Sequence, residues 1–261
     1  RILVEKGIAV FIEKPLSNTI HNCDSLVQAV EKRPVTVQIG FDMRFHPVFL
    51  TANQALESGR LGKLYSLSCE VGQYLPDWRP DVDYAQSTSA KAELGGGALL
   101  ELCHEINYVQ ALLGFEKVEV VAFKDKVSDL DVNVDDVVNI LLKGKNRFGC
   151  QTMATIHLDF LQRSPKRLCV VVGSEGTLTM DFISNTVILD LCGQTQVLFD
   201  GSDFDGNTVY LDEIAAFFLS IESNAEPITS LLDGLCTQTF IEAIRESSEE
   251  GCVKTLSLES C

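Results

Sequence analysis

Near its start, the chain places a lysine at the carboxyl end of an apolar run. The run from residue 9 leads into Glu13, Lys14 and Pro15, and it predicts a buried strand. Ligands of open parallel sheets bind at the carboxyl ends of the strands. A lysine at that point can hold a hydroxyl or carbonyl oxygen through a charged hydrogen bond, which favours alkoxide character in a transition state. The alternative is an ordinary surface lysine at a strand end.

A second polar cluster follows a triple glycine at 95–97, which would let the backbone approach a ligand closely. Glu101, His104 and Asn107 recur at every third position of an apolar segment, so a helix over 96–113 would place them along one side. His104 is the candidate proton acceptor, because histidine needs little tuning to titrate near neutral pH. Glu101 or Asn107 can orient the imidazole while the other binds a substrate hydroxyl. The pattern alone favours the alternative of a solvent-exposed stripe.

Two domains, divided near residue 41, must position these side chains. A strand over 9–14, a helix over 19–32 and a strand over 35–41 predict the α/β tail of a parallel sheet. Residues 42–261 predict an α+β domain, because alternating segments separated by turn residues indicate a large, mostly antiparallel sheet. After a helix over 47–59, the strands are expected within 64–74, 118–128, 134–144, 148–160, 167–173, 177–182 and 186–191. Helices at 96–113, 207–224 and 232–247 are expected to cover one face of this sheet.

The composition limits the class of protein. With 261 residues, 46% of them hydrophobic, the chain can bury a substantial core. A net charge of −16 makes nucleic acid and anionic membranes poor partners, and no apolar run reaches the roughly 18 residues that a membrane span needs. The nine cysteines form no C-x-x-C pair. They predict reduced, mostly buried thiols in a cytoplasmic protein, with no disulfide framework and no metal site.

Four segments in this order resemble the glucose-fructose oxidoreductase / inositol dehydrogenase / rhizopine-catabolism (Gfo/Idh/MocA) family. They are the EKP tripeptide, VQIGFDMRFHP at 37–47, YLPDWRPDVDY at 74–84 and GGGALLELCHEIN at 95–107. The resemblance runs from about residue 1 to about residue 255. The third segment also resembles a branch associated with bacterial surface-sugar and nonulosonate metabolism. The resemblance implies an oxidoreductase that uses NAD or NADP and favours the active-site interpretation of the helix.

The resemblance also implies roles for individual residues. Lys14, His104 and Glu101 would be catalytic, although the family usually has aspartate at the positions of Glu101 and Asn107. The expected cofactor-binding residues are Glu13, Lys14, Pro15, Trp78 and Arg79, and the expected substrate-binding residues are Arg44, Tyr84, Asn107 and Arg163. For each arginine alone, a surface ion pair is the alternative. His46 and His157 are expected to be structural.

Family members begin with a Gly-rich turn that cradles the cofactor pyrophosphate, and this sequence has no such turn. We therefore expect residues 1–41 to be the end of a cofactor domain, in a fragment that is inactive alone. The predicted reaction is hydride transfer between nicotinamide and a sugar or sugar-derived secondary alcohol. A non-catalytic oligomerising subunit is one alternative. Another is a lyase-like cycle that keeps the nicotinamide bound and regenerates it.

The second face of the large sheet predicts a subunit contact. Along 134–144, the side chains of Val137, Asn139, Leu141 and Lys143 project away from the face that carries Val138. Neither face is clearly polar at its centre, and the resemblance implies a homodimer or homotetramer through this open face. A sheet that faces water with scattered exposed aliphatic residues is the alternative.

Overall fold

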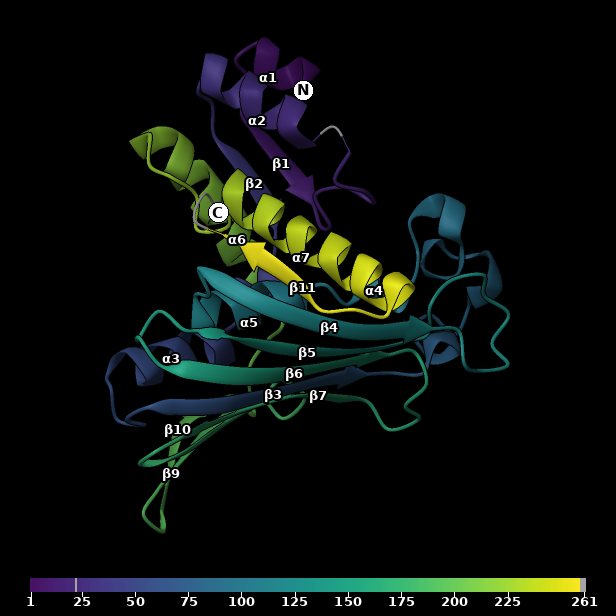
Figure 1. Ribbon diagram of the computed structural model, residues 1–261. Coiled ribbons are helices and arrows are strands. Elements are labelled where there is room, and N and C mark those ends of the chain that lie inside the picture. Colours follow the sequence, from purple (N-terminus) through teal and green to yellow (C-terminus); the bar gives the residue numbers. More distant parts are fainter. Residues whose placement is uncertain (22, 259–261) are drawn as a thin grey trace.

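A computed structural model describes residues 1–21 and 23–258. The amino-terminal part contains α1 (Ile2–Glu5), β1 (Val10–Glu13), α2 (Cys23–Lys32) and β2 (Val37–Gly40). The two strands pair in parallel, with Ile12 opposite Ile39. This confirms the predicted strand-helix-strand tail, and Lys14 directly follows β1. Figure 1 shows this part standing above a large curved sheet formed by the rest of the chain.

The large sheet has nine strands in the order β10-β9-β8-β7-β3-β6-β5-β4-β11. All neighbouring pairs are antiparallel except β3 with β6, so the predicted mostly antiparallel sheet is confirmed. Two of its strands, β10 and β11, were not predicted. The strands are β3 (Leu64–Gly72), β4 (Lys117–Asp125), β5 (Val137–Lys145), β6 (Gln151–Asp159), β7 (Lys166–Gly173), β8 (Gly176–Asp181), β9 (Thr186–Leu191), β10 (Gln194–Asp200) and β11 (Lys254–Ser257).

Helices pack against one face of this sheet. Figure 1 shows α7 (Leu231–Glu250) lying along β4 and β11, and α3 (Pro47–Glu57) at the other end of the sheet. The helix α7 begins with a capping box in which Ser230 and Asp233 satisfy each other's backbone amides. The helix α6 (Asn207–Ser223) reaches back to the amino-terminal part, where Phe217 packs edge-on against Phe11 of β1.

The expected single helix over 96–113 is wrong. The structure has a short helix α4 (Ala98–Glu101), a break at Leu102 and Cys103, and a second helix α5 (His104–Leu113). Leu102 leaves the helical region with φ −101° and ψ 26°. Glu101 and His104 therefore belong to different helices, and they do not share one helical stripe.

Short helical turns connect these elements. A 3₁₀ turn η1 (Asp42–Arg44) follows β2 at the junction of the two parts. Four more 3₁₀ turns carry the chain from β3 to α4: η2 (Leu75–Asp77), η3 (Tyr84–Gln86), η4 (Thr88–Ala90) and η5 (Ala92–Leu94). Within residues 1–21 and 23–258, no helix is long and apolar enough to cross a membrane.

Candidate active site

Lys14 and His104 line one cavity of about 350 Å³ at the carboxyl end of β1. Lys14 reaches it from the end of β1, and His104 from the first turn of α5. Because the break after α4 restarts the helix at His104, the imidazole lies at a helix beginning, 12% exposed. The walls are contributed by the residues that follow β1 and β2, by α4 and α5, and by segments near β3, β7 and α6. They are Lys14, Asp42, Val71, Gly72, Gln73, Trp78, Glu101, Leu102, His104, Pro165, Lys166, Arg167, Ile183 and Tyr210.

Glu101 holds Lys14. The ammonium of Lys14 donates to the backbone carbonyl of Glu101 at 2.8 Å and lies 3.4 Å from the Glu101 carboxylate. The other carboxylate oxygen of Glu101 accepts a hydrogen bond of 2.8 Å from the hydroxyl of Ser89. Both oxygens of Glu101 are thus occupied by partners other than His104. The expectation that Glu101 orients the imidazole is therefore replaced by a contact to the lysine.

His104 approaches a carboxylate that the sequence analysis did not single out. Its Nδ1 lies 3.3 Å from Oδ1 of Asp42 in η1, without the alignment of a full hydrogen bond. The ring also packs edge-on against Phe41. Burial lowers the pKa of His104 well below its usual value, and the charges of Lys14 and Arg167 lower it further. At neutral pH, the imidazole is therefore uncharged and able to accept a proton.

The remaining cations of the cavity are paired with acids. Arg167 grips the fully buried carboxylate of Glu105 through two hydrogen bonds of 2.7 and 3.1 Å. Lys166 donates to Glu70 at 2.6 Å. The walls therefore offer charged hydrogen-bond donors without a large excess of positive charge. A ligand rich in hydroxyl groups suits such walls.

The triple glycine serves protein packing. A Cβ on Gly96 would lie 2.6 Å from the carbonyl oxygen of Ser89, and one on Gly97 would lie 2.9 Å from Oδ1 of Asp135. Gly97 also has φ +112°, a conformation that favours glycine. Asp135 in turn accepts the amide hydrogen of Leu99 and so caps α4. The glycines let the start of α4 pack closely against Ser89 and Asp135. The atoms that crowd Gly96 and Gly97 therefore belong to the protein, whereas a ligand was expected there.

Arg44 and Asn107, two of the predicted substrate-binding residues, line another cavity, of about 610 Å³. Arg44 lies 3.2 Å from Asp233, and the amide of Asn107 donates to Thr237 at 3.1 Å. Asn107 follows His104 by three residues in α5, so the two share one side of that helix. Their side chains nevertheless line different cavities, because the amide of Asn107 is engaged by Thr237 of α7 while His104 lines the cavity with Lys14. The structure therefore does not place Asn107 in the cavity of His104.

The other predicted residues lie around or beside the cavity. Trp78 belongs to its wall, whereas Arg79 and Tyr84 line a small crevice behind Trp78. Arg163 stacks over the ring of Tyr74, with its guanidinium carbon 3.4 Å from the ring centre. Glu13 and Pro15 flank Lys14 outside the described walls, and the Glu13 carboxylate lies over Gly40 of β2.

Asp42 and Tyr210 were missed by sequence reasoning. Asp42 follows β2 at the same sheet edge as Lys14, so its place after a strand was a usable signal. Tyr210 lies on α6, more than a hundred residues from every other wall residue of the amino-terminal part. Nothing in the sequence indicates that α6 returns to β1.

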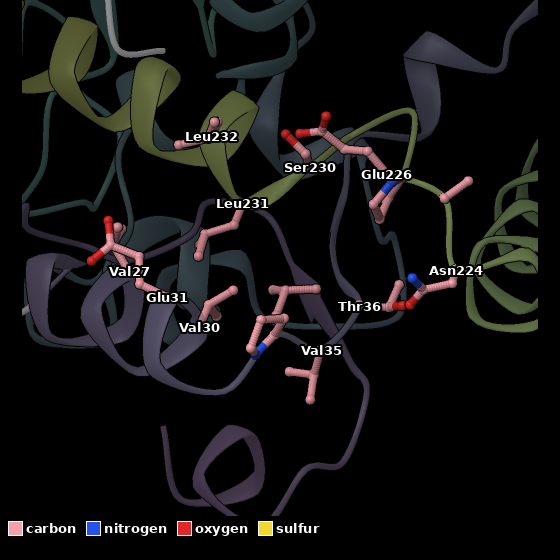
Figure 2. Close-up of a pocket in the computed structure, with 14 residues that line it drawn as sticks. Val27, Val30, Glu31, Val35, Thr36, Asn224, Glu226, Ser230, Leu231 and Leu232 are labelled. Carbon is pink, nitrogen blue, oxygen red and sulfur yellow. The ribbon is translucent and has the colours of Figure 1, made fainter.

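A larger groove elsewhere lacks catalytic groups. It has a volume of about 480 Å³, and Figure 2 shows Leu231 pointing toward Val30 across it. Its walls, formed by α2, the start of β2 and residues 224–232, contain no histidine, lysine or arginine. In the described part of the chain, no group of three His, Cys, Asp or Glu side chains could hold a metal ion. Among the groove and the cavities described above, only the Lys14–His104 cavity contains both a histidine and a lysine.

Two family models match this chain. The GFO/IDH/MocA C-terminal domain matches residues 49–179, and the oxidoreductase family with an NAD-binding Rossmann fold matches residues 1–41. Myo-inositol 2-dehydrogenase of Thermotoga maritima is 26% identical over 92% of this chain and 70% of its own length. A 2,7-anhydro-N-acetylneuraminate hydratase of Escherichia coli is 25% identical over 72% of this chain and 49% of its own length.

A solved structure shares the fold. Levoglucosan dehydrogenase, in complex with NADH and levoglucosan, superposes on this chain with a TM-score of 0.83 at 19% sequence identity. The match covers 97% of this chain and 75% of that one. The family resemblance inferred from the four sequence segments is confirmed, and the chain belongs to the GFO/IDH/MocA oxidoreductase family.

Proposed function

We propose that this chain carries the substrate site of an NAD(P)-dependent oxidoreductase that acts on a secondary alcohol of a sugar or sugar-derived polyol. One observation carries the proposal. A buried, uncharged imidazole and a lysine ammonium face the same cavity at the carboxyl end of β1. Oxidation of an alcohol needs a group that accepts the hydroxyl proton and a cation that stabilises the oxygen as it gains negative charge.

In this proposal, His104 accepts the hydroxyl proton through Nε2, and Lys14 holds the same oxygen. Glu101 fixes the position of the ammonium through two contacts, so little reorganisation is needed when the substrate binds. The paired state of Lys166 and Arg167 favours a substrate with hydroxyl groups, each of which can both donate and accept. Within the class of sugar-derived substrates, nonulosonates and other sugar acids are a more specific candidate.

The residues at the nicotinamide end fit such a cofactor. Lys14 stands at the end of β1, the first of two parallel strands, and the flat indole of Trp78 forms a wall of the same cavity. Lys14, with Glu13 and Pro15 beside it, and Trp78 would hold that end of the dinucleotide. A bound NAD(P) supplies the acceptor for the hydride.

The test compares single variants of the natural gene product with myo-inositol, levoglucosan and a panel of aldoses as substrates. His104→Ala should lower kcat by about 10²- to 10⁴-fold, the usual contribution of one general base. The matched control is His21→Ala, at an exposed histidine that does not line the cavity, which should keep wild-type turnover. Reduced nicotinamide is followed by absorbance. Near-normal turnover of His104→Ala would refute the role of His104.

A second candidate reaction has support from one comparison. The hydratase relative from Escherichia coli favours a cycle without net oxidation, in which the same base removes a proton and the nicotinamide is restored within each turnover. The two reactions differ in stoichiometry. A dehydrogenase accumulates one reduced nicotinamide per product, whereas the redox-neutral cycle forms product with catalytic amounts of NAD(P) and accumulates none.

We also propose that the open face of the large sheet joins two copies of the chain. Large apolar side chains are exposed on it, among them Phe123, Leu141 and Met153, which are 68%, 45% and 50% exposed. They lie on adjacent strands β4, β5 and β6. A contiguous apolar area on a sheet face is typical of a subunit contact, and size-exclusion chromatography with light scattering tests it.

A further inference from the structure

The Nδ1 atom of His104 lies 3.3 Å from the Asp42 carboxylate, and the two side chains are 12% and 17% exposed. Among the described residues, Nδ1 is buried and has no partner with the geometry of a full hydrogen bond. A buried ring nitrogen needs a partner, and hydrogen bonds of catalytic groups are often long or poorly aligned until substrate binds. Asp42 is therefore the group placed to receive a proton from Nδ1.

Glu101 cannot take this role. One of its oxygens accepts from Ser89 at 2.8 Å, and the other faces Lys14 at 3.4 Å. Asp42, in contrast, pairs with no lysine or arginine among the described residues, and its ion-pair-distance neighbour is the imidazole of His104. Its Oδ1 is held in place by the amide hydrogen of Met43 at 2.8 Å. The local backbone thus fixes the carboxylate, and the carboxylate fixes the ring.

Tyr210 connects α6 to this pair. Burial raises the pKa of the Asp42 carboxyl, and the charge of Arg167, the amide of Met43, the charge of Lys14 and a hydrogen bond from the Tyr210 hydroxyl each oppose that rise without cancelling it. Two other titratable groups are close to Tyr210: Glu13 from β1 and Glu213 from α6. Glu213 also interacts with Asp42, and burial, followed by the charge of Asp42, raises the pKa of Glu213 to about 8. The Tyr210 donor therefore favours the ionised carboxylate in surroundings that otherwise disfavour it.

We propose that Asp42 is a positioning residue that holds His104 in the tautomer with hydrogen on Nδ1, leaving the lone pair of Nε2 directed into the cavity. The proposal rests on the proposed function, because a bare Nε2 is what a proton acceptor needs. A neutral imidazole carries one N–H and one acceptor nitrogen, so the partner of Nδ1 decides which nitrogen can act as the base. No atom of Asp42 needs to touch the substrate.

The first test reads the tautomer and needs no turnover. The ring nitrogens of His104 are observed by ¹⁵N NMR in residues 1–261 at neutral pH and assigned with His104→Gln, which is feasible with four histidines in the chain. The wild type should show a protonated Nδ1. Asp42→Asn should move the population toward a protonated Nε2, because the amide can present its NH₂ group to Nδ1. Asp42→Ala should leave a mixture.

The matched control is Glu101→Gln, which neutralises another carboxylate of the same cavity. It should leave the tautomer of His104 unchanged, because Glu101 contacts Lys14 and Ser89. Backbone amide spectra of each variant check that the fold is retained. The proposal would be overturned if Asp42→Asn and Asp42→Ala both folded natively and both kept the His104 tautomer of the wild type.

The second test measures turnover of the natural gene product. Asp42→Asn should lower kcat by about 10- to 10³-fold, with the KM for the alcohol within about twofold, since an acceptor in the wrong tautomer harms the transition state more than ground-state binding. Tyr210→Phe should lower kcat less. A changed tautomer with unchanged kcat would refute the proposed role of His104 as the base while leaving the positioning contact intact.

Discussion

The Lys14 ammonium donates to the backbone carbonyl of Glu101, at 2.8 Å, at the last residue of α4. The contact joins β1, in the amino-terminal part, to the helix break in the second part. Carbonyls at a helix end lack partners within the helix, so the lysine satisfies a backbone group while it also contacts the Glu101 carboxylate and lines the cavity. The break between α4 and α5 thus creates a site for the cation and frees His104 at the start of the next helix.

This contact predicts that lysine cannot be replaced by arginine. In the natural gene product, Lys14→Arg should lose most of its activity, because the planar guanidinium cannot occupy the position of the compact ammonium. Lys14→Ala should lower kcat and raise the KM for the dinucleotide. Steady-state kinetics with alcohol and cofactor varied in turn measure both. Full activity of Lys14→Arg would mean that only the charge matters at this position.

Glu213 predicts a fall in stability toward alkaline pH. Burial, followed by repulsion from Asp42 and Glu13, raises its pKa to about 8 from 4.5. The folded state therefore holds a proton that the unfolded state loses above about pH 4.5. The stabilisation is fully present below that pH and is lost as pH rises through 8. The midpoint temperature of thermal unfolding of the wild type should therefore decrease as the pH is raised from 5 to 8.5.

The matched variant is Glu213→Gln, which keeps the size of the side chain and removes its titration. Its unfolding midpoint should depend less on pH over the same range and should exceed that of the wild type at pH 8.5. Differential scanning calorimetry in buffers of equal ionic strength provides the comparison. Parallel curves for the two proteins would show that Glu213 does not titrate in this window.

Gly96 predicts a packing requirement. Gly96→Ala should destabilise the fold by about 1 to 3 kcal/mol, the usual cost of overpacking, because its Cβ would meet the backbone oxygen of Ser89 at 2.6 Å. Gly206→Ala is the control, since a Cβ there has no neighbour within 4 Å. Chemical unfolding measures both. Equal stability of the two variants would contradict the close approach of η4 to the start of α4.

The open sheet face predicts a mutation that separates subunits. Leu141→Asp should reduce the molar mass measured by light scattering, because a charge in a buried apolar contact is costly. Leu94→Asp in η5, at a leucine that is also exposed but lies away from the sheet, should leave the mass unchanged. A wild-type protein that is monomeric at every concentration tested would exclude the contact.

Sequence patterns alone determined the two-part architecture and the pair at its centre. The strand before Lys14 and the alternating segments of the large sheet could be predicted because apolar periodicity reports which face of an element is buried. His104 could be singled out because few residue types serve as a base near neutral pH. Strands β10 and β11 were missed, since QTQVLFD and KTLS carry too few apolar residues to signal a buried face.

The tertiary structure decided how the chemical groups combine. Helical spacing placed Glu101, His104 and Asn107 together, but the break at Leu102 and Cys103 puts Glu101 in a separate helix, and spacing rules hold only within one uninterrupted helix. His104 and Asn107 share α5, yet they line different cavities. Asp42 reaches His104 from η1, and Tyr210 reaches Asp42 through the return of α6 to the amino-terminal part. Such contacts arise from the packing of whole elements, and a local pattern of residues carries no record of which distant segment will cover it.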